Sequence, residues 1–257
     1  MYPTRLDPYG CGCQHDCKYC YAKSLLDFRG LWNAENPSVA NIGKIDRAIS
    51  KLPPGQIVRL GGMTDCFQPI ERQHRVTCET IKLLNQYNIG YLIVTKSHIV
   101  AEPDYLSLLN PERAHIQITV TTLDDEKSLE YEKASVPSKR IRAIQTLQDD
   151  GFDVAVRLSP LLEYMDFDRL NELELEKCVV EFLRVNTWIQ RWFSGLDYSK
   201  YTYRQSNYRH LPPEDKQRLI SKIPISNLTV CEDVTEHYAY WKTHVNPNPD
   251  DCCNLRQ

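Results

Sequence analysis

Short runs rich in β-branched residues alternate with stretches of helical spacing along the first two thirds of the chain. This alternation is typical of βαβ units and a parallel sheet, and five or six such units can form a full or partial α/β barrel. Strands are predicted at residues 56–60, 89–95, 115–121, 152–158 and 178–185. Helices are predicted at residues 42–52, 71–88, 104–109, 138–150 and 168–177.

Polar and small residues follow the predicted strands. The carboxyl ends of parallel strands meet at one edge of a sheet, so residues that follow the strands line a common mouth. The sequence therefore predicts a polar site at this edge. The strand-end residues are Gly61-Gly-Met-Thr-Asp65, Thr95-Lys-Ser97, Thr121-Thr122, Arg157-Leu-Ser-Pro160 and Arg184.

The composition is that of an ordinary globular protein. The 257 residues are 42% apolar and 25% charged, with a net charge of −3 and a pI of about 6.2. This suits one large domain, or one domain with an appendage, and gives no general attraction for nucleic acid. No apolar run approaches the length that spans a membrane, and the first residues, Met-Tyr-Pro-Thr-Arg, lack the apolar core of a signal peptide. We therefore expect a cytoplasmic protein whose cysteines are metal ligands and buried thiols.

Three cysteines near the N-terminus carry the most specific chemistry. Cys13, Cys17 and Cys20 form a C-x3-C-x2-C spacing, which can aim three thiolates at one metal centre. A [4Fe–4S] cluster usually takes four thiolates, so three would leave one iron open to an outside ligand. With Cys11 as a fourth ligand, the same loop could instead form a closed zinc site.

Five blocks in order distinguish these alternatives, because together they resemble the radical SAM (S-adenosylmethionine) superfamily. Within it, the chain is similar to the branch of spore photoproduct lyase, often described as DNA-repair-photolyase-like. The likeness spans roughly residues 5–165 and favours the iron–sulfur cluster over zinc. The blocks are Cys13-Gln-His-Asp-Cys-Lys-Tyr-Cys-Tyr-Ala22, Thr64-Asp-Cys-Phe-Gln-Pro-Ile-Glu71, Val94-Thr-Lys-Ser97, Val120-Thr-Thr-Leu123 and Val156-Arg-Leu-Ser-Pro160.

The resemblance implies a fold and a division of the chain. A partial (β/α)6 TIM-type barrel would occupy residues 1–185, and a mostly helical or irregular extension, residues 186–257, would pack on it. The implied reaction is reductive cleavage of S-adenosylmethionine to methionine and a 5′-deoxyadenosyl radical, which removes a hydrogen atom from an inert C–H bond. A flavodoxin- or ferredoxin-type partner would supply the electron.

The resemblance also implies which residues bind the cofactors. Cys13, Cys17 and Cys20 would hold a [4Fe–4S] cluster, and the amino and carboxylate groups of S-adenosylmethionine would bind its fourth iron. Tyr19 is expected beside the adenine. The other expected contacts are Gly61, Gly62, Thr64 and Asp65 at the methionyl amino group, Lys96 and Thr121 near the methionyl carboxylate, and Arg157, Ser159, Pro160 and Leu161 along the ribose and adenine.

Two of these positions, and the neighbouring Cys66, have simpler interpretations. Lys96 could be a solvated lysine at a strand end, and Asp65 could be a helix N-cap. Cys66 is a candidate catalytic residue because it follows Asp65 and could return a hydrogen atom to a product radical. We favour its interpretation as a small buried thiol, because the cysteine of the lyase does not align with it.

The substrate is predicted from the segment Tyr198–His210, which interleaves tyrosines with cations and contains no acid. Such a segment suits stacking on bases and pairing with phosphates, although its tyrosines could also pack on the barrel. A nucleic-acid base or nucleotide is therefore our first expectation, and a peptide or small metabolite is the alternative. A zinc-stabilised nucleic-acid-binding protein without catalysis is the alternative from another class. The candidate substrate residues are Tyr201, Tyr203, Arg204 and Arg209.

A second metal site is predicted near the C-terminus. Cys252 and Cys253 are adjacent in a Pro- and Asn-rich tail, and Cys231 and His237 precede them. An auxiliary iron–sulfur cluster or a zinc ion would explain this set, with Cys11 as a fourth ligand. The alternative is a group of unpaired thiols near an irregular chain end.

Overall fold

The computed structural model describes residues 4–255. The first three residues, on which the expectation of no signal peptide partly rests, lie outside the described residues. Seven strands form one sheet in the order β1-β4-β5-β6-β7-β8-β11, and every neighbouring pair is parallel. Among the described residues the two edge strands do not pair with each other, so the sheet is an open barrel. The strands are β1 (Thr4–Leu6), β4 (Ile57–Leu60), β5 (Gly90–Thr95), β6 (Ala114–Thr119), β7 (Asp153–Leu161), β8 (Lys177–Phe182) and β11 (Asn227–Val230).

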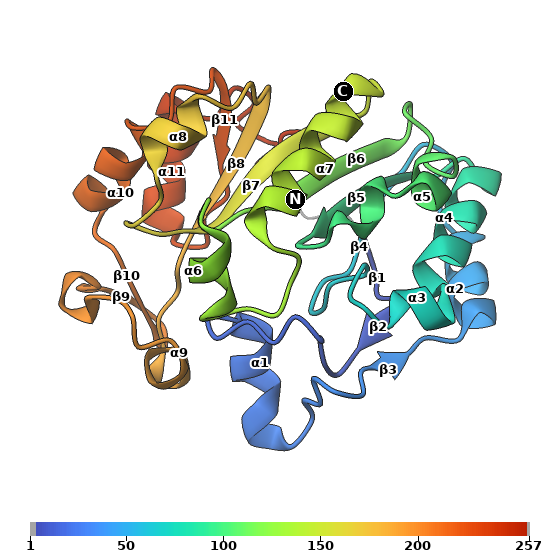
Figure 1. Ribbon diagram of the computed structural model, residues 1–257, viewed down its shortest axis with the longest axis horizontal. Coiled ribbons are helices and arrows are strands. Elements are labelled where there is room, and N and C mark those ends of the chain that lie inside the picture. The colour runs from blue at the N-terminus through green and yellow to red at the C-terminus, as the bar shows by residue number, and fades with distance from the viewer. Residues whose placement is uncertain (1–3, 256–257) are drawn as a thin grey trace.

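Helices lie along the outside of the curved sheet, as Figure 1 shows. All six residues of β6 are buried, which is typical of a central parallel strand covered on both faces. This arrangement confirms the predicted α/β class and the partial barrel. The helices are α1 (Tyr21–Leu26), α2 (Ile42–Ile49), α3 (Glu71–His74), α4 (Val76–Gln86), α5 (Pro103–Leu106), α6 (Asp125–Leu129), α7 (Pro137–Asp149), α8 (Phe167–Asn171), α9 (Thr187–Trp192), α10 (Pro213–Ile220) and α11 (Thr235–His244), with short 3-10 turns at Asp27–Arg29, His98–Ala101 and Tyr198–Lys200.

The helix predicted at residues 71–88 is broken in two at Arg75, which adopts a left-handed conformation with φ 51°. The carboxylate of Glu71 folds back over the start of α4 and accepts hydrogen bonds from the amides of Thr77, at 2.9 Å, and Cys78, at 3.0 Å. These amides have no partner inside the helix, so a buried acceptor stabilises a new helix start there. Hydrophobic spacing alone does not reveal such a break.

The sheet continues beyond residue 185, where the sequence analysis ended the barrel. Strand β11 pairs in parallel with β8, so part of the predicted extension completes the main sheet. Strand β7 runs to Leu161, beyond the predicted end at residue 158. Helix α8 ends at Asn171 and not at the predicted residue 177, and the chain that follows buries Leu175. Two small antiparallel ribbons were not predicted: β2 (Tyr9–Gly10) with β3 (Ser38–Val39), and β9 (Tyr203–Gln205) with β10 (Tyr208–His210).

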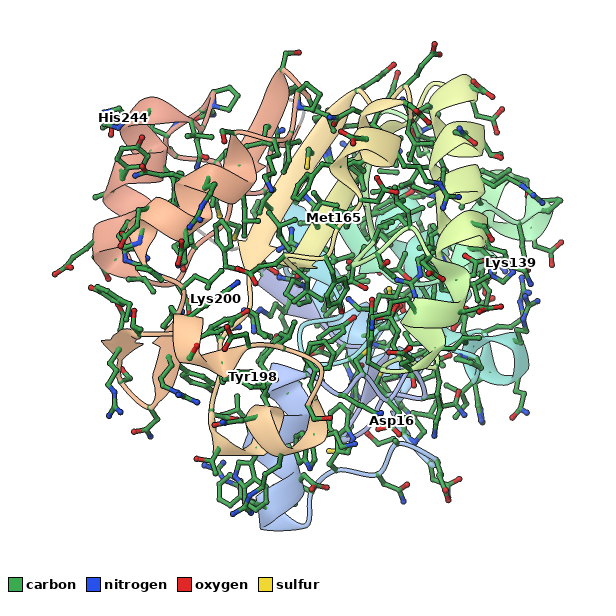
Figure 2. The ribbon with its side chains drawn as sticks, turned by 60° about the vertical axis from the view of Figure 1, so that its left-hand side comes forward. Asp16, Lys139, Met165, Tyr198, Lys200 and His244 are labelled. Atoms are coloured by element: carbon green, nitrogen blue, oxygen red, sulfur yellow. The ribbon has the colours of Figure 1, made fainter. Side chains whose placement is uncertain are left out.

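The remaining C-terminal elements surround the carboxyl ends of the strands on one side. Figure 2 shows the segment labelled by Tyr198 and Lys200 between α1 and the C-terminal helices, one of which ends at His244. Over residues 4–255, no helix has both the length and the apolar character to cross a bilayer.

Candidate active site

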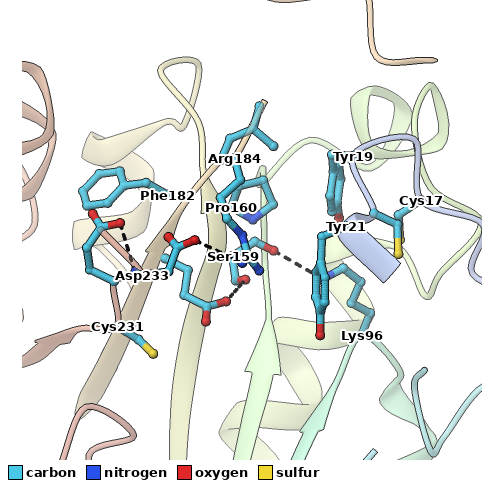
Figure 3. A pocket seen from close by; sticks show the side chains of 14 residues that line it. Cys17, Tyr19, Tyr21, Lys96, Ser159, Pro160, Phe182, Arg184, Cys231 and Asp233 are labelled. Carbon is cyan, nitrogen blue, oxygen red and sulfur yellow. Dashed lines mark hydrogen bonds and ion pairs between the residues drawn. The ribbon is translucent and has the colours of Figure 1, made fainter. Parts of the chain in front are cut away.

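A cavity of about 190 Å³ opens at the carboxyl ends of the strands. Its wall combines the cysteine loop with residues in or just after the carboxyl-terminal ends of β5, β7, β8 and β11, which is the common mouth that the strand-end residues predict. Figure 3 shows Cys17, Tyr19, Tyr21 and Lys96 on one side and Cys231, Phe182 and Asp233 on the other. The lining residues are Cys17, Tyr19, Cys20, Tyr21, Lys96, Ser159, Pro160, Glu181, Phe182, Leu183, Arg184, Cys231, Glu232 and Asp233.

The cysteine loop turns tightly between β2 and α1. The amide of Asp16 donates to the carbonyl of Cys13 at 3.1 Å, and the amide of Cys20 donates to the carbonyl of Cys17 at 3.2 Å. Gly12 has φ 155°, and a Cβ atom there would lie 1.7 Å from the carbonyl oxygen of Asn33, so only glycine fits. The loop is therefore folded by its own sequence, with Cys17 and Cys20 in the wall of the cavity and Cys13 buried.

The chemistry of this donor set fits an iron–sulfur cluster better than one zinc ion. A tetrahedral zinc site, with Zn–S near 2.3 Å, places its sulfurs roughly 3.8 Å apart. Within the described part of the chain, the sulfurs of Cys13, Cys17 and Cys20 do not all lie within 4.8 Å of one another. A cluster needs wider spacing because each thiolate binds a different iron. Cys11 is exposed, and it joins no such compact group.

The electrostatic surroundings of the loop also suit a metal centre. Burial raises the pKa of the Cys13 thiol to about 12, so this cysteine stays neutral unless a metal displaces its proton. Burial likewise raises the pKa of Cys17 and of Cys20, and the charge of Lys96 acts in the opposite direction on both. Lys96 is thus placed to favour thiolates at the cavity.

A buried ion pair between Glu132 and Arg140 stabilises the cysteine loop. Both side chains are fully buried, and Arg140 also donates to the carbonyl of Thr119 at 2.9 Å. Glu132 accepts hydrogen bonds from the hydroxyl of Tyr19 and from the thiol of Cys17, the latter at 3.9 Å. This ion pair, formed by Arg140 of α7 and Glu132 of the segment before α7, thereby holds two residues of the cysteine loop.

Asp65 organises the end of β4 rather than facing the cavity. Its carboxylate accepts hydrogen bonds from the amides of Phe67, at 2.8 Å, and Lys96, at 2.7 Å, and from the hydroxyl of Thr95, at 2.8 Å. His15 Nε2 lies 3.1 Å from the same carboxylate. Burial alone would raise the pKa of Asp65, but His15 and the two amides leave it below its usual value. Asp65 therefore ties the cysteine loop to β5, and its place beside the methionyl amino group stays a prediction.

Lys96 lines the cavity, where its ammonium can contact the carboxylate of a bound ligand. Its ammonium lies 3.3 Å from the carbonyl oxygen of Ser159 and 5.5 Å from the centre of the Tyr19 ring. Among the residues that the structure describes, no carboxylate forms an ion pair with it, so its charge is available to a ligand. Tyr19 is buried beside Tyr131 and Phe193, with ring centres 5.7 Å away in each case.

The glycines after β4 permit a close turn. Gly61 has φ 73°, and a Cβ atom there would lie 2.5 Å from the carbonyl oxygen of Thr64. The carbonyl of Gly62 accepts from the hydroxyl of Tyr21 at 2.6 Å, which connects this turn to α1. The hydroxyl of Thr64 donates to the carbonyl of Tyr9 at 2.7 Å. This turn lies outside the cavity lining, although Tyr21 is part of that lining.

The residues expected along the ribose and adenine divide into two groups. Ser159 and Pro160 line the cavity, whereas Leu161 is buried in the core. Arg157 is also buried and pairs with Glu181, while the hydroxyl of Ser159 donates to the same carboxylate at 2.5 Å. Burial would raise the pKa of Glu181, but Arg157 and the hydrogen bond from Ser159 lower it to about 2. Arg157 therefore fixes a negative charge in the wall of the cavity.

Two further predicted residues lie away from the cavity. Thr121 is buried, and its hydroxyl lies 3.0 Å from that of Tyr131. Cys66 is completely buried in the hydrophobic core and is not among the lining residues. This placement matches its interpretation as a buried thiol.

The tyrosine-rich segment is split between core and surface. Tyr201 is only 4% exposed, so it cannot stack on a base, and Tyr203 donates its hydroxyl to Glu236 at 2.6 Å. Arg204 and Arg209 line a second cavity, a groove of about 810 Å³ beside α1 and α9. The prediction of substrate residues therefore needs correction at Tyr201, because that ring packs inside the fold.

The C-terminal cysteines meet, but not as a compact metal site. The sulfurs of Cys231 and Cys252 are 3.4 Å apart, and Cys253 is the hydrogen-bonded neighbour of Cys252. No group of three ligand atoms within 4.8 Å includes them among residues 4–255. His237 lies elsewhere, with its Nδ1 2.9 Å from the ammonium of Lys216.

One compact group does exist in the described residues, formed by His210, Glu232 and Asp233. Its two carboxylates already pair with cations, Glu232 with Lys216 and Asp233 with Arg184. A metal cation would have to displace both, so this group is better explained as a salt-bridge network.

Sequence reasoning missed several residues of this site. The ion pair of Glu132 and Arg140, the partnership of His15 with Asp65, and the position of Cys231 in the cavity wall arise from segments far apart in the chain. His15 lies inside the cysteine motif, so its place between two ligands was the one available signal. The other residues carry no local signature.

The open parallel barrel and the three-cysteine loop at its strand ends together indicate the class to which this protein belongs. The family model of the radical SAM superfamily matches residues 8–174, well over half of the chain. The chain belongs to the radical SAM superfamily.

Among individual proteins, the chain is 25% identical over 154 residues to the uncharacterized protein MJ0683 of Methanocaldococcus jannaschii. The match covers 59% of this chain and 58% of that protein, so the chain spans a little over half of the length of this relative. The relative therefore supports kinship but assigns no activity.

Solved structures with a similar fold include several of spore photoproduct lyase. A mutant of that enzyme with serine in place of a cysteine matches with a TM-score of 0.67 and 15% identity, over 88% of this chain and 75% of that one. A double mutant with bound AdoMet and dinucleoside spore photoproduct matches with a TM-score of 0.64 and 15% identity, over 88% and 75%. The protein anSMEcpe with bound AdoMet matches with a TM-score of 0.53 and 12% identity, over 86% and 60%. At these identities the likeness concerns the fold.

Proposed function

We propose that this chain is a radical SAM enzyme that acts on a base of single-stranded or locally opened nucleic acid. In this proposal Cys13, Cys17 and Cys20 hold a [4Fe–4S] cluster, and S-adenosylmethionine lies in the cavity that Tyr19 and Lys96 line. The observation that carries the proposal is a three-cysteine loop that places Cys17 and Cys20 in the wall of a cavity, beside a lysine that forms no ion pair among residues 4–255.

When bound, the cluster and S-adenosylmethionine supply a 5′-deoxyadenosyl radical that removes a hydrogen atom from the substrate. The residues of the chain bind and orient the reactants. Lys96 offers a charge for the methionyl carboxylate, and Tyr19 offers an apolar ring for the adenine. The buried wall of Phe182 and Leu183 excludes water from the reacting atoms.

Support for a nucleic-acid substrate comes from the groove beside α1 and α9. Its wall carries aromatic rings, Phe28 and Trp188, together with Arg204 and Arg209. Phe28 is 58% exposed and Trp188 is 38% exposed, so both rings are accessible to a ligand in the groove. Aromatic rings interleaved with guanidinium groups suit the stacked bases and phosphates of a single strand.

Arg184 connects this groove to the cavity. Its guanidinium lies 4.7 Å from the ring centre of Tyr21, a cavity residue, and 5.9 Å from that of Tyr208, a groove residue. A strand held in the groove would therefore pass beside Arg184 and could direct one base into the cavity. The dinucleoside bound in a structurally similar lyase is consistent with a substrate of this class.

The proposal is tested by binding and turnover under anaerobic conditions. A fluorescent single-stranded oligonucleotide should bind the reconstituted protein with an affinity that falls steeply with salt. Arg204→Ala and Arg209→Ala should each weaken binding and reduce the salt slope by about one. Arg47→Ala on α2, an exposed arginine outside the groove, is the matched control and should leave binding unchanged.

The two parts of the proposal fail separately. Formation of 5′-deoxyadenosine without any oligonucleotide binding would retain the enzyme class and point to a peptide or small metabolite. Oligonucleotide binding without iron or S-adenosylmethionine cleavage would contradict the enzyme class.

A further inference from the structure

The C-terminal tail brings two cysteines against a third at the wall of the cavity. Cys231 follows β11 and lines the cavity, whereas Cys252 and Cys253 come from the tail that runs back beneath the barrel. The carbonyl of Cys253 accepts a hydrogen bond of 2.5 Å from Gln117 in the central strand β6. Asn254 donates to the side chain of Asn227 at 2.9 Å, which fixes the tail at the start of β11. The three thiols therefore meet in a defined position.

We infer that Cys231 and Cys252 form a reversible disulfide that ties the C-terminal tail to the wall of the cavity. Their sulfurs are 3.4 Å apart, so the bond needs only a small approach of two side chains that already touch. Cys252 is partly exposed, which gives a small-molecule disulfide access to one member of the pair, while Cys231 is buried.

The arrangement of the third thiol explains how the exchange begins. Cys253 shares a hydrogen bond with Cys252, and the guanidinium groups of Arg157 and Arg59 act on its charge. The hydrogen bond and these two cations together lower the pKa of Cys253 to about 7. The hydrogen bonds to Cys231 and Cys253 raise the pKa of Cys252, so this sulfur attacks only as its proton passes to the Cys253 thiolate.

The exchange is balanced in two steps. The Cys252 sulfur attacks a low-molecular-weight disulfide and forms a mixed disulfide, and its proton passes by way of Cys253 to the small thiolate that leaves, which departs as a thiol. Cys231 then gives up its proton, attacks the Cys252 sulfur and releases the second small thiol. The protein loses two hydrogen atoms in total, and both appear on the two small thiols.

A redox pair fits the geometry better than the metal site that the sequence suggests. Two of the sulfurs are in contact, but the three do not form a compact group among the described residues, and Cys11 and His237 do not join them. Where thiols are otherwise kept reduced, disulfides of this kind are usually transient and regulatory.

The experiment uses the full chain in anaerobic buffers with graded ratios of oxidised to reduced glutathione. Samples are quenched with acid, alkylated after denaturation, digested and mapped by mass spectrometry. Cys231 and Cys252 should lose alkylation together, appear as one linked peptide lacking two hydrogen atoms, and recover fully with dithiothreitol. Cys78 and Cys178, which are buried free thiols outside the trio, should be fully alkylated at every ratio.

Variants separate the roles of the three thiols. Cys231→Ser should accumulate the mixed disulfide at Cys252, and Cys253→Ser should slow closure by about tenfold because the base is missing. Cys178→Ser is the matched control on the neighbouring strand and should behave as the parent. Cys17→Ala should also behave as the parent, because the disulfide between Cys231 and Cys252 does not depend on the cluster.

Three results would overturn the inference. The first is full alkylation of Cys231 and Cys252 at every ratio. The second is a link between Cys252 and Cys253 instead. The third is a stoichiometric zinc ion, measured by elemental analysis, that protects all three thiols and is lost in Cys252→Ser.

Discussion

The chain contains two trios of cysteines, and they are assembled in different ways. Cys13, Cys17 and Cys20 lie in one short loop, whereas the other trio joins the end of β11 to a tail more than twenty positions further along. The sulfurs of the loop trio do not all lie within 4.8 Å of one another, and two of its cysteines line the cavity, whereas the tail trio has two sulfurs in contact. Spacing within one loop therefore predicts a cluster site, but adjacency in the sequence does not predict what a tail thiol contacts.

The two regions also differ in how the fold supports them. The loop is held by buried charges from distant segments, Glu132 with Arg140 and His15 with Asp65. The tail is held by neutral amide hydrogen bonds from Gln117 and Asn254. Removing one partner of a buried ion pair costs more than removing a neutral hydrogen bond, so the loop should be the more sensitive of the two regions.

The largest effect is expected from Cys17→Ala. Removing one of three thiolates leaves the cluster with two protein ligands, so bound iron and formation of 5′-deoxyadenosine should fall to background. Cys78→Ala, which removes a buried thiol in α4, should keep both. Iron analysis and chromatography of the nucleoside measure the two outcomes, and retention of iron in Cys17→Ala would assign the cluster to other ligands.

A smaller but still large effect is expected from Arg140→Met. This change leaves the Glu132 carboxylate buried without its cation, which typically costs about 3–5 kcal/mol of unfolding free energy. Urea unfolding measures the loss. Lys82→Met, which breaks an exposed pair with Glu79, should cause no measurable change. If the two variants proved equally stable, the ion pair would not support the loop.

Lys96→Met should weaken binding of S-adenosylmethionine roughly tenfold to a hundredfold, because a charge-assisted contact with its carboxylate is removed. Iron content should stay that of the parent, since Lys96 is not a ligand. Equilibrium dialysis with labelled cofactor measures the change, and Lys139→Met on the exposed side of α7 is the control. An unchanged affinity would show that Lys96 is a solvated lysine at a strand end and not a contact of the cofactor.

The smallest effect concerns pH. The pKa of Glu181 is lowered to about 2 in the fold, below its ordinary value. The stability that it contributes is therefore present above the unfolded pKa of about 4.3 and is lost as pH falls toward 2. Glu181→Gln should flatten the decline of unfolding free energy over that window, and a profile identical to that of the parent would show that Arg157 and Ser159 do not stabilise this carboxylate.

Much of the architecture could be predicted from the sequence because parallel strands and helices carry strong local periodicity. The central strands, the strand-end mouth, and the placement of Lys96, Ser159, Pro160 and Arg184 around it follow from that periodicity. The break at Arg75 could not be predicted, because it depends on a carboxylate that folds back onto α4. Nor could β11, a short strand isolated in sequence from its partner β8, or the burial of Tyr201.

The central claim is that the loop of Cys13, Cys17 and Cys20 leaves one coordination position for S-adenosylmethionine. The most direct measurement is made on anaerobically reconstituted protein, by counting iron and then following the electron paramagnetic resonance of the reduced protein as S-adenosylmethionine is added. The account predicts about four irons per chain and a spectrum that changes on addition of the cofactor. Protein without iron, or a cluster whose spectrum does not respond to the cofactor, would contradict it.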